Sequence, residues 1–304
     1  MQNHRAHRQA GGISLIVAAL LATTHLRCEA QTHPIAFDRN DAIYVLDPET
    51  KKPRKIVDGI FPAVSPDGAR IAFNTVEKNG TTYDRHIAVV NIADGKTTVF
   101  KDVPSTNSYY PIWTRDGQWI AFTLRRDQVW DLARIKPDGT GFAVIRKGAE
   151  GETTFYSPCW SSDGQSLFCQ DMTNIYRLNL DGSVAEKWKI HDVIPNGDMS
   201  GDGRISVSPD GKHLLLSIEM GEEHHRKDWD GPPPALWSFD LASHRATRLT
   251  AKNLFAWDGC WLDNDNVIFL SSKAGEKEPS LYSMAPNGSG LKKLAPDAHW
   301  PAAP

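Results

Sequence analysis

The residues with the most obvious chemical potential lie in one polar segment, residues 222–234. It reads Glu-Glu-His-His-Arg-Lys-Asp-Trp-Asp-Gly-Pro-Pro-Pro. Neutral imidazoles and carboxylates are common ligands of transition metals, so His224 and His225 are candidate metal ligands. Trp229 is a candidate anchor for a bound partner. The side chains of adjacent histidines diverge, so the alternative is a solvated loop ended by a stiff proline run.

A second candidate is the segment Asp198-Met199-Ser200-Gly201-Asp202-Gly203. Oxygen-bearing residues alternate in it and glycine stands sixth, as in the first half of a calcium-binding loop. The glutamate expected at the twelfth position is replaced by Pro209. Asp198 and Asp202 are therefore candidate ligands for a divalent metal cofactor, and a glycine-rich turn is the alternative.

A short sequence motif recurs along the chain around these segments. One copy is Ser-Pro-Asp-Gly-Ala-Arg-Ile-Ala-Phe at residues 65–73. Further copies lie at residues 114–122, 161–168 and 208–215, with a degenerate copy at 262–269. Asp-Gly between apolar runs predicts a two-residue hairpin turn, because glycine adopts positive φ at little cost. A repeat of this length predicts a propeller or a solenoid.

A second set of β-rich runs alternates with this motif. The six runs are residues 43–46, 87–90, 132–135, 175–178, 236–239 and 281–284. Four strands per unit and six units predict an all-β fold, a six-bladed β-propeller of four-stranded antiparallel blades. Residues 34–37 match a second strand, and residues near Trp300 match a first strand. We therefore expect the last blade to be closed by both termini, with Trp300 at the position of Trp113, Trp160 and Trp261.

The copy at residues 110–122, Tyr-Pro-Ile-Trp-Thr-Arg-Asp-Gly-Gln-Trp-Ile-Ala-Phe, resembles the TolB-type repeat among the WD-like repeat families. The resemblance covers residues 34–304 and implies a TolB-like six-bladed propeller. TolB proteins carry an α/β domain before the propeller, for which this sequence has no room, so a role in Tol translocation is not expected. Similar repeats occur in oligogalacturonate lyases and in prolyl-oligopeptidase-like enzymes, but the Gly-x-Ser-x-Gly elbow of the latter is missing.

Residues 1–30 have the three parts of a secretory signal peptide. Basic residues precede an apolar run at 13–21, and Cys28-Glu29-Ala30 offers a cleavage site. The apolar run is too short for a transmembrane span, which needs about 20 residues. Arg27 directly before Cys28 is unfavourable for lipidation. We expect a periplasmic or secreted protein whose residues 31–304 form a single domain.

Composition narrows the classes of partner. The 304 residues carry a formal net charge of −3 and no basic stripe, so nucleic acid is not expected as a partner. Three cysteines follow residue 30, and an odd number argues against a disulfide framework. Cys159 and Cys169 lie on the two strands of one predicted hairpin, where a bridge is the less favoured alternative. We expect a monomer.

In a propeller the Asp-Gly turns share one face, and the loops between blades ring the channel mouth on the other face. Function is expected at that loop-rich mouth. The residues expected to line it are Tyr109, Tyr110, Phe155, Tyr156, Arg204, Trp257, Asp258 and His299. Aromatic rings with a few charges suit a peptide or a carbohydrate, although the same residues also suit packing between blades.

These patterns favour a non-catalytic module that binds a protein, a peptide or a glycan at the loop-rich mouth. The alternative is a metal-dependent lyase or hydrolase that acts on a polysaccharide or oligosaccharide. The resemblance to oligogalacturonate lyases implies several histidines converging on a metal in the central funnel. Only His224, His225 and His299 are available for that role.

Overall fold

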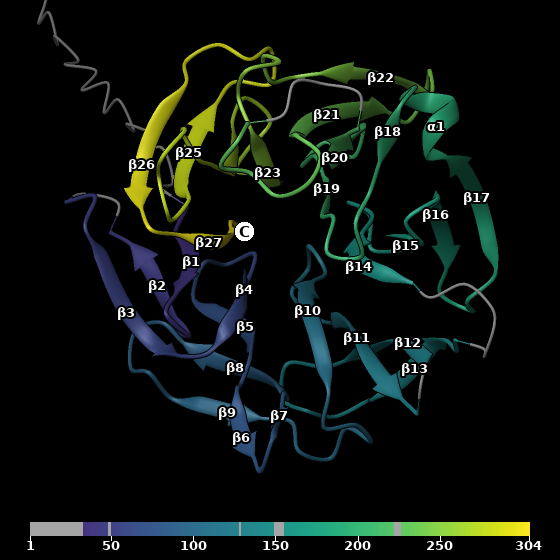
Figure 1. Cartoon of the computed structure of the whole chain (residues 1–304). Helices are drawn as coiled ribbons and strands as arrows, with labels where there is room; N and C mark the ends of the chain where they lie inside the picture. The colour runs from purple at the N-terminus through teal and green to yellow at the C-terminus, as the bar shows by residue number, and fades with distance from the viewer. Residues whose placement is uncertain (1–32, 48–49, 128, 149–154, 222–225) are drawn as a thin grey trace, which may run out of the picture. The chain divides into compact units, whose positions relative to one another are not determined.

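The computed structural model describes residues 33–47, 50–127, 129–148, 155–221 and 226–304. These residues form six antiparallel blade sheets arranged in a ring, with the innermost strand of each sheet facing the centre (Figure 1). The predicted six-bladed β-propeller is therefore confirmed. Blades are numbered from 1, which contains β1, to 6, which contains β24.

Each blade has the same strand order from the channel outward. The innermost strands of blades 1 to 6 are β27 (His299–Ala302), β4 (Ile60–Val64), β10 (Ser108–Trp113), β14 (Tyr156–Trp160), β19 (Ile205–Val207) and β23 (Ala256–Trp261). The second strands are β1 (Ile35–Arg39), β5 (Arg70–Asn74), β11 (Ile120–Arg126), β15 (Ser166–Gln170), β20 (His213–Met220) and β24 (Val267–Ser271).

The third and fourth strands complete the blades. The third strands are β2 (Ala42–Leu46), β8 (Ile87–Asn91), β12 (Val129–Ile135), β16 (Asn174–Asn179), β21 (Pro234–Asp240) and β25 (Ser280–Met284). The outer strands are β3 (Pro53–Asp58), β9 (Thr97–Val99), β13 (Ala143–Arg146), β17 (Val184–Lys189), β22 (Arg245–Arg248) and β26 (Lys292–Pro296).

Four short elements lie outside the four-strand pattern of the blades. The hairpin of β6 (Glu77–Asn79) and β7 (Thr82–Asp84) extends the loop between the second and third strands of blade 2. The other two are β18 (Gly197–Asp198), which pairs with β20, and the helix α1 (Ile190–Val193). The described part of the chain contains no helix with the length and apolarity that a membrane crossing requires.

Blade 1 is closed by both ends of the chain, as the sequence predicts. β27 pairs with β1 through Ala36 opposite Ala302 and Asp38 opposite His299. This register corrects one expectation: Trp300 is not at the position of Trp113, Trp160 and Trp261. Ala303 takes that position, because it stands one residue after Ala302 as Trp113 stands one residue after Ile112. Trp300 lies three residues earlier, at the position of Tyr110.

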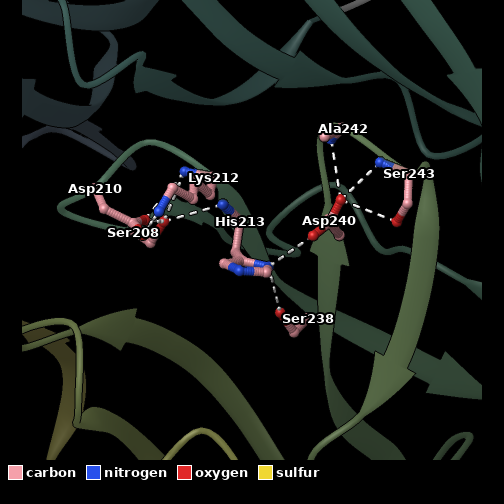
Figure 2. A network of polar contacts seen from close by, with 8 residues as sticks. All are labelled: Ser208, Asp210, Lys212, His213, Ser238, Asp240, Ala242 and Ser243. Atoms are coloured by element: carbon pink, nitrogen blue, oxygen red, sulfur yellow. Dashed lines mark hydrogen bonds and ion pairs between the residues drawn. The ribbon is translucent and has the colours of Figure 1, made fainter.

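The Asp-Gly turns are longer than the two-residue hairpins predicted from Asp-Gly alone. In blade 5 the amide of Ser208 donates to the carbonyl of His213, so four residues form the loop. Figure 2 shows why: the hydroxyl of Ser208 donates to Asp210 (2.7 Å) and accepts the amide of His213 (2.9 Å). The serine side chain thus satisfies the backbone of a wider loop, and Gly211 supplies its positive φ of 73°.

The hydrophobic core lies between neighbouring sheets, not at the channel axis. One cluster, for example, joins Ile43 and Val45 of blade 1 to Val64, Ile71 and Phe73 of blade 2. Indole N–H groups strengthen these contacts, since Trp113 donates to the carbonyl of Ala63 in the preceding blade (2.9 Å). Stacking around a ring therefore buries both faces of each sheet and leaves only short edges.

The three described cysteines are buried free thiols. Cys159 pairs in register with Phe168, so Cys169 points to the opposite face of blade 4 and no bridge between them forms. Cys260 occupies in blade 6 the position that Cys159 occupies in blade 4. Burial raises the pKa of Cys159 to about 11, so it remains a thiol at neutral pH.

Candidate functional site

One residue in each blade occupies an equivalent position of the innermost strand, close to the central channel. We call these six residues the constriction ring. Each stands three residues before the last repeat position of its inner strand, which is Trp113 in blade 3. They are Phe61, Tyr110, Ser157, Arg204, Asp258 and Trp300. In five blades the strand has a register shift here, and the ring residue adopts a positive φ between 44° and 58°. Non-glycine residues rarely adopt this conformation, which marks the ring as a candidate functional feature.

The aromatic members of the constriction ring meet across blades. Tyr110 of blade 3 stacks on Trp300 of blade 1 with ring centroids 4.8 Å apart, and Phe61 of blade 2 contacts both rings at 4.9 Å. The guanidinium of Arg204 lies 5.3 Å from the ring centroid of Trp300 and donates to the carbonyl of Pro301. These contacts join blades 1, 2, 3 and 5 on the mouth side of a second compartment, which is described below.

The charges beside the constriction ring are strongly perturbed by burial. Burial raises the pKa of Asp258 to about 7, while nearby Arg204 opposes the shift. Burial also raises the pKa of Asp38 to about 6, and His299 opposes that shift. The pKa of Tyr110 is raised above its ordinary range by burial, with Asp202 and Asp258 adding to the effect. Asp258 therefore titrates near neutral pH beside a fixed positive charge.

A half-buried aromatic cluster lies at the loop-rich mouth above blades 1 to 3. Tyr109 contacts Phe61 (5.9 Å), Tyr110 (5.6 Å) and Trp130 (5.3 Å) through its ring. The guanidinium of Arg85 lies 5.3 Å from the ring centroid of Tyr109 and 5.6 Å from that of Tyr83, on the β6–β7 hairpin. Tyr83 is 49% exposed, so the cluster reaches from the channel to the surface.

A second aromatic group at the mouth belongs to blades 5 and 6. Trp229 contacts Trp257 (5.1 Å) and Phe255 (5.5 Å). Arg226 anchors the same loop, because its Nη1 donates to the carbonyl of Ser272 in blade 6 (2.5 Å). Trp229 therefore lies beside Trp257, which precedes Asp258 in the chain. His224 and His225 lie outside the described residues.

Other predicted mouth residues are distributed differently. The ring of Tyr156 lies against Gly201, in the segment that carries Asp202. Phe155 is buried and contacts Tyr176, so it belongs to the core. Arg204 is only 8% exposed and lines the second compartment.

Two groups of described residues bear on metal binding. Glu278, Asp297 and His299 have ligand atoms within 4.8 Å of one another, although Arg39 already pairs with Asp297 at 3.2 Å. The candidates Asp198 and Asp202 are not part of that group. Asp198 pairs instead with Nε2 of His191 (2.8 Å). The described residues therefore offer one three-ligand group, and His299 is its only member that the sequence analysis considered for a metal.

The second compartment is a chamber of about 490 Å³ on the face of the Asp-Gly turns. The last repeat position of each inner strand lines this chamber, and we call it the wall position. Its occupants in blades 1 to 6 are Ala303, Val64, Trp113, Trp160, Val207 and Trp261. The sequence directed attention to the opposite face. The signal for the chamber was present as the exchange of tryptophan for valine at residues 64 and 207.

The sequence analysis did not identify Phe61 and Trp130 as residues of the mouth. Phe61 precedes Val64 by three residues as Tyr110 precedes Trp113, so the repeat itself could have identified it. Trp130 stands at the start of β12, where nothing in its spacing separates it from a core residue. Its place beside Tyr109 depends on how blade 3 is twisted and packed.

Comparison with known proteins agrees with this architecture. No family model matches the chain. A 108-residue segment, 36% of the chain, is 31% identical to a TolB homologue of Chlorobium luteolum and spans 22% of that relative's length. The solved structure of TolB from Acinetobacter baumannii matches with a TM-score of 0.65 and 15% identity over 89% of this chain and 66% of that one. A chain in a nidogen/laminin complex matches with a TM-score of 0.64 and 12% identity over 89% of this chain and 97% of that one. The fold is thus a TolB-like six-bladed β-propeller.

Proposed function

We propose that this protein is a non-catalytic module that binds a protein or peptide at the loop-rich mouth of its propeller. The observation that carries the proposal is the aromatic cluster of Phe61, Tyr109, Tyr110 and Trp130. Its rings are half-buried and in mutual contact instead of being enclosed in the core. Tyrosine, tryptophan and arginine are the residues that dominate the binding energy of protein interfaces.

The surroundings of the cluster support a peptide as the ligand. The β6–β7 hairpin carries the exposed Tyr83 and the half-buried Arg85. Asp202 is exposed near Tyr110, on the other side of the channel from the hairpin's blade. A segment of partner chain crossing the mouth would meet aromatic rings on one side and a carboxylate on the other. The similarity to a propeller found in a nidogen/laminin complex fits this proposal at the level of the fold.

Binding is tested by retaining partners from a cell-envelope extract on the immobilised protein and then measuring the Kd of the purified partner. Tyr109→Ala and Trp229→Ala should each weaken binding at least about tenfold, as expected for aromatic anchors. Leu291→Ala is the matched control, because Leu291 is 49% exposed near the turn between β25 and β26, on the opposite face. Unchanged affinity in both aromatic variants would refute the proposal, and retention on a glycan array alone would replace the peptide by a glycan.

The proposal includes export to the periplasm or the exterior, which rests on residues 1–30. These residues lie outside the described part of the chain. Amino-terminal sequencing of the protein from fractionated cells should find a start near residue 31. A cytoplasmic protein that keeps residue 1 would contradict export without affecting the peptide site.

A metal-dependent carbohydrate lyase or hydrolase is the second candidate. The group of Glu278, Asp297 and His299 is the observation that favours it, because these residue types ligate divalent metals. Metal analysis of the purified protein, with His299→Ala as the comparison, separates the two functions. Stoichiometric metal that is lost in the variant, together with depolymerising activity, would favour the enzyme.

A further inference from the structure

The chamber on the Asp-Gly face arises from the identity of six residues at the wall position. Blades 3, 4 and 6 carry tryptophan there, whereas blades 1, 2 and 5 carry Ala303, Val64 and Val207. Trp160 donates its indole N–H to the carbonyl of Ile112 in the preceding blade (3.1 Å), which holds the ring against the channel wall. Three small residues therefore line the chamber where the other three blades carry buried indoles. The chamber volume of about 490 Å³ lies within the range of small-molecule sites.

Two guanidinium groups line the chamber, and each can pair with an anion. At the inner end lies Arg204, which is 8% exposed, and Arg115 lies at the rim. Asp263 and Pro304, the last residue of the sequence, also line the chamber. Asp263 accepts the amide of Asp265 (2.8 Å) and the Nδ2 group of Asn266 (3.0 Å). Asp258, beside Arg204, has a pKa raised to about 7 by burial, so its charge offsets that of Arg204 only in part at neutral pH.

We propose that this chamber is a second binding site, which takes a small organic anion with a planar apolar body. The anionic group would lie against the guanidinium of Arg204, which keeps donors beyond the one given to Pro301. The apolar body would lie beside Trp113, Trp160 and Trp261, which line the chamber and are each 4–6% exposed. This site goes beyond the proposed function, because it lies on the other side of the constriction ring and takes a different class of ligand.

The probe for this site is 8-anilinonaphthalene-1-sulfonate, an aromatic anion whose fluorescence rises in apolar surroundings. N-phenyl-1-naphthylamine, which lacks the sulfonate, is the neutral control. The folded wild-type protein should bind the anion at one saturable site and bind it more tightly than the neutral compound. Comparable affinity for the two compounds would overturn the assignment of an anion site.

Val207→Trp is the sharpest variant, since tryptophan already occupies the wall position in three blades. The added indole should fill the chamber and weaken binding of the anionic probe at least about tenfold, while partner binding at the loop-rich mouth stays unchanged. Val64→Trp makes the same test from blade 2 if the first variant folds poorly. Undiminished probe binding in a folded variant of either kind would overturn the chamber as the site.

Arg204→Met tests the charge. It should weaken binding of the sulfonate about tenfold, because a charge-assisted hydrogen bond is lost, and leave binding of the neutral compound within about twofold. Equal loss for both compounds would indicate a collapsed chamber, and loss for neither would show that Arg204 does not contact the anion. Either result would overturn the role given to Arg204. Failure of the peptide proposal would leave the results with the two fluorescent probes unaffected, because these are measured without the partner.

Discussion

The loop-rich mouth and the chamber lie at opposite ends of the same six inner strands, and three residues separate the positions that build them. At the constriction ring, beside the mouth, Phe61, Tyr110 and Trp300 form mutual contacts across the channel. At the wall position, three residues further on, Trp113 and Trp160 turn their indoles toward the preceding blade. Aromatic rings therefore close the channel at one position and line it at the other.

The difference follows from backbone conformation. Ring residues such as Tyr110 have positive φ at a register shift, which directs the side chain across the channel. Trp113 pairs regularly with Ile120, and its indole N–H donates to the carbonyl of Ala63 in the preceding blade. A repeated strand with one irregular residue thus supplies two kinds of surface.

Removal of residues 297–304 should have the largest effect, because β27 contributes to both ends. Trp300 belongs to the constriction ring and Ala303 to the wall position. Loss of the closing strand and of one large aromatic should lower the free energy of unfolding by at least about 4 kcal/mol. Thermal unfolding of the truncated chain measures this. An unchanged Tm would mean that closure by β27 does not stabilise the ring.

A turn substitution should damage the chamber end through stability alone. Gly117 has a φ of 69° in the Asp-Gly turn of blade 3. Gly117→Val should cost about 1–3 kcal/mol, since a β-branched residue is strained there. Gly117→Asn is the matched control and should cost less, because asparagine tolerates positive φ. Denaturant titration compares them. If the folded fraction of the Gly117→Val variant bound the partner more weakly, the peptide site would lie on the face of the Asp-Gly turns and not at the loop-rich mouth.

The pH dependence of stability should include a contribution from Asp258 of the constriction ring. Because burial raises the pKa of Asp258 from 3.8 to about 7, the folded state binds a proton more tightly than the unfolded state. The stabilisation from this group is complete below about pH 4 and is lost as the pH rises through about 7. Arg204, Asp202 and Asp38 are the charged groups that act on it.

Asp258→Asn should therefore remove that part of the slope. The test is denaturant unfolding of both proteins between pH 5 and pH 8 (roughly the span on either side of the titration). The difference in unfolding free energy, variant minus wild type, should rise with pH. A difference that stays constant over this range would show that Asp258 does not titrate as its burial implies.

The smallest effect on stability is expected at the mouth. Combined replacement of His224, His225 and Trp229 by alanine should cost about 1 kcal/mol, most of it from the ring contacts of Trp229 with Trp257 and Phe255. Partner binding should fall far more than stability. Calorimetric unfolding and partner titration on the same samples separate the two quantities. A triple variant that binds normally would identify this loop as a solvated insertion.

Much of the fold was accessible from the repeat. The five motif copies and six β-rich runs predicted the blades, and the match of residues 34–37 to a second strand predicted the closure by β27. Local patterns sufficed because every blade must present the same apolar faces to its neighbours. The width of the Asp-Gly turns was not accessible in this way, because it depends on the hydroxyl of Ser208 reaching both Asp210 and a backbone amide.

The sequence by itself determined which residues recur every blade, and hence the propeller, its closure and the sides on which turns and loops lie. Only the tertiary structure decided what those residues do at the channel. The meeting of Tyr110 with Trp300, and of Arg204 with Pro301, joins residues that are far apart in the chain. Likewise, Val207 lines a chamber only because the inner strands of the other five blades surround the same channel. Periodicity specifies a strand locally, whereas a channel is a property of all six blades together.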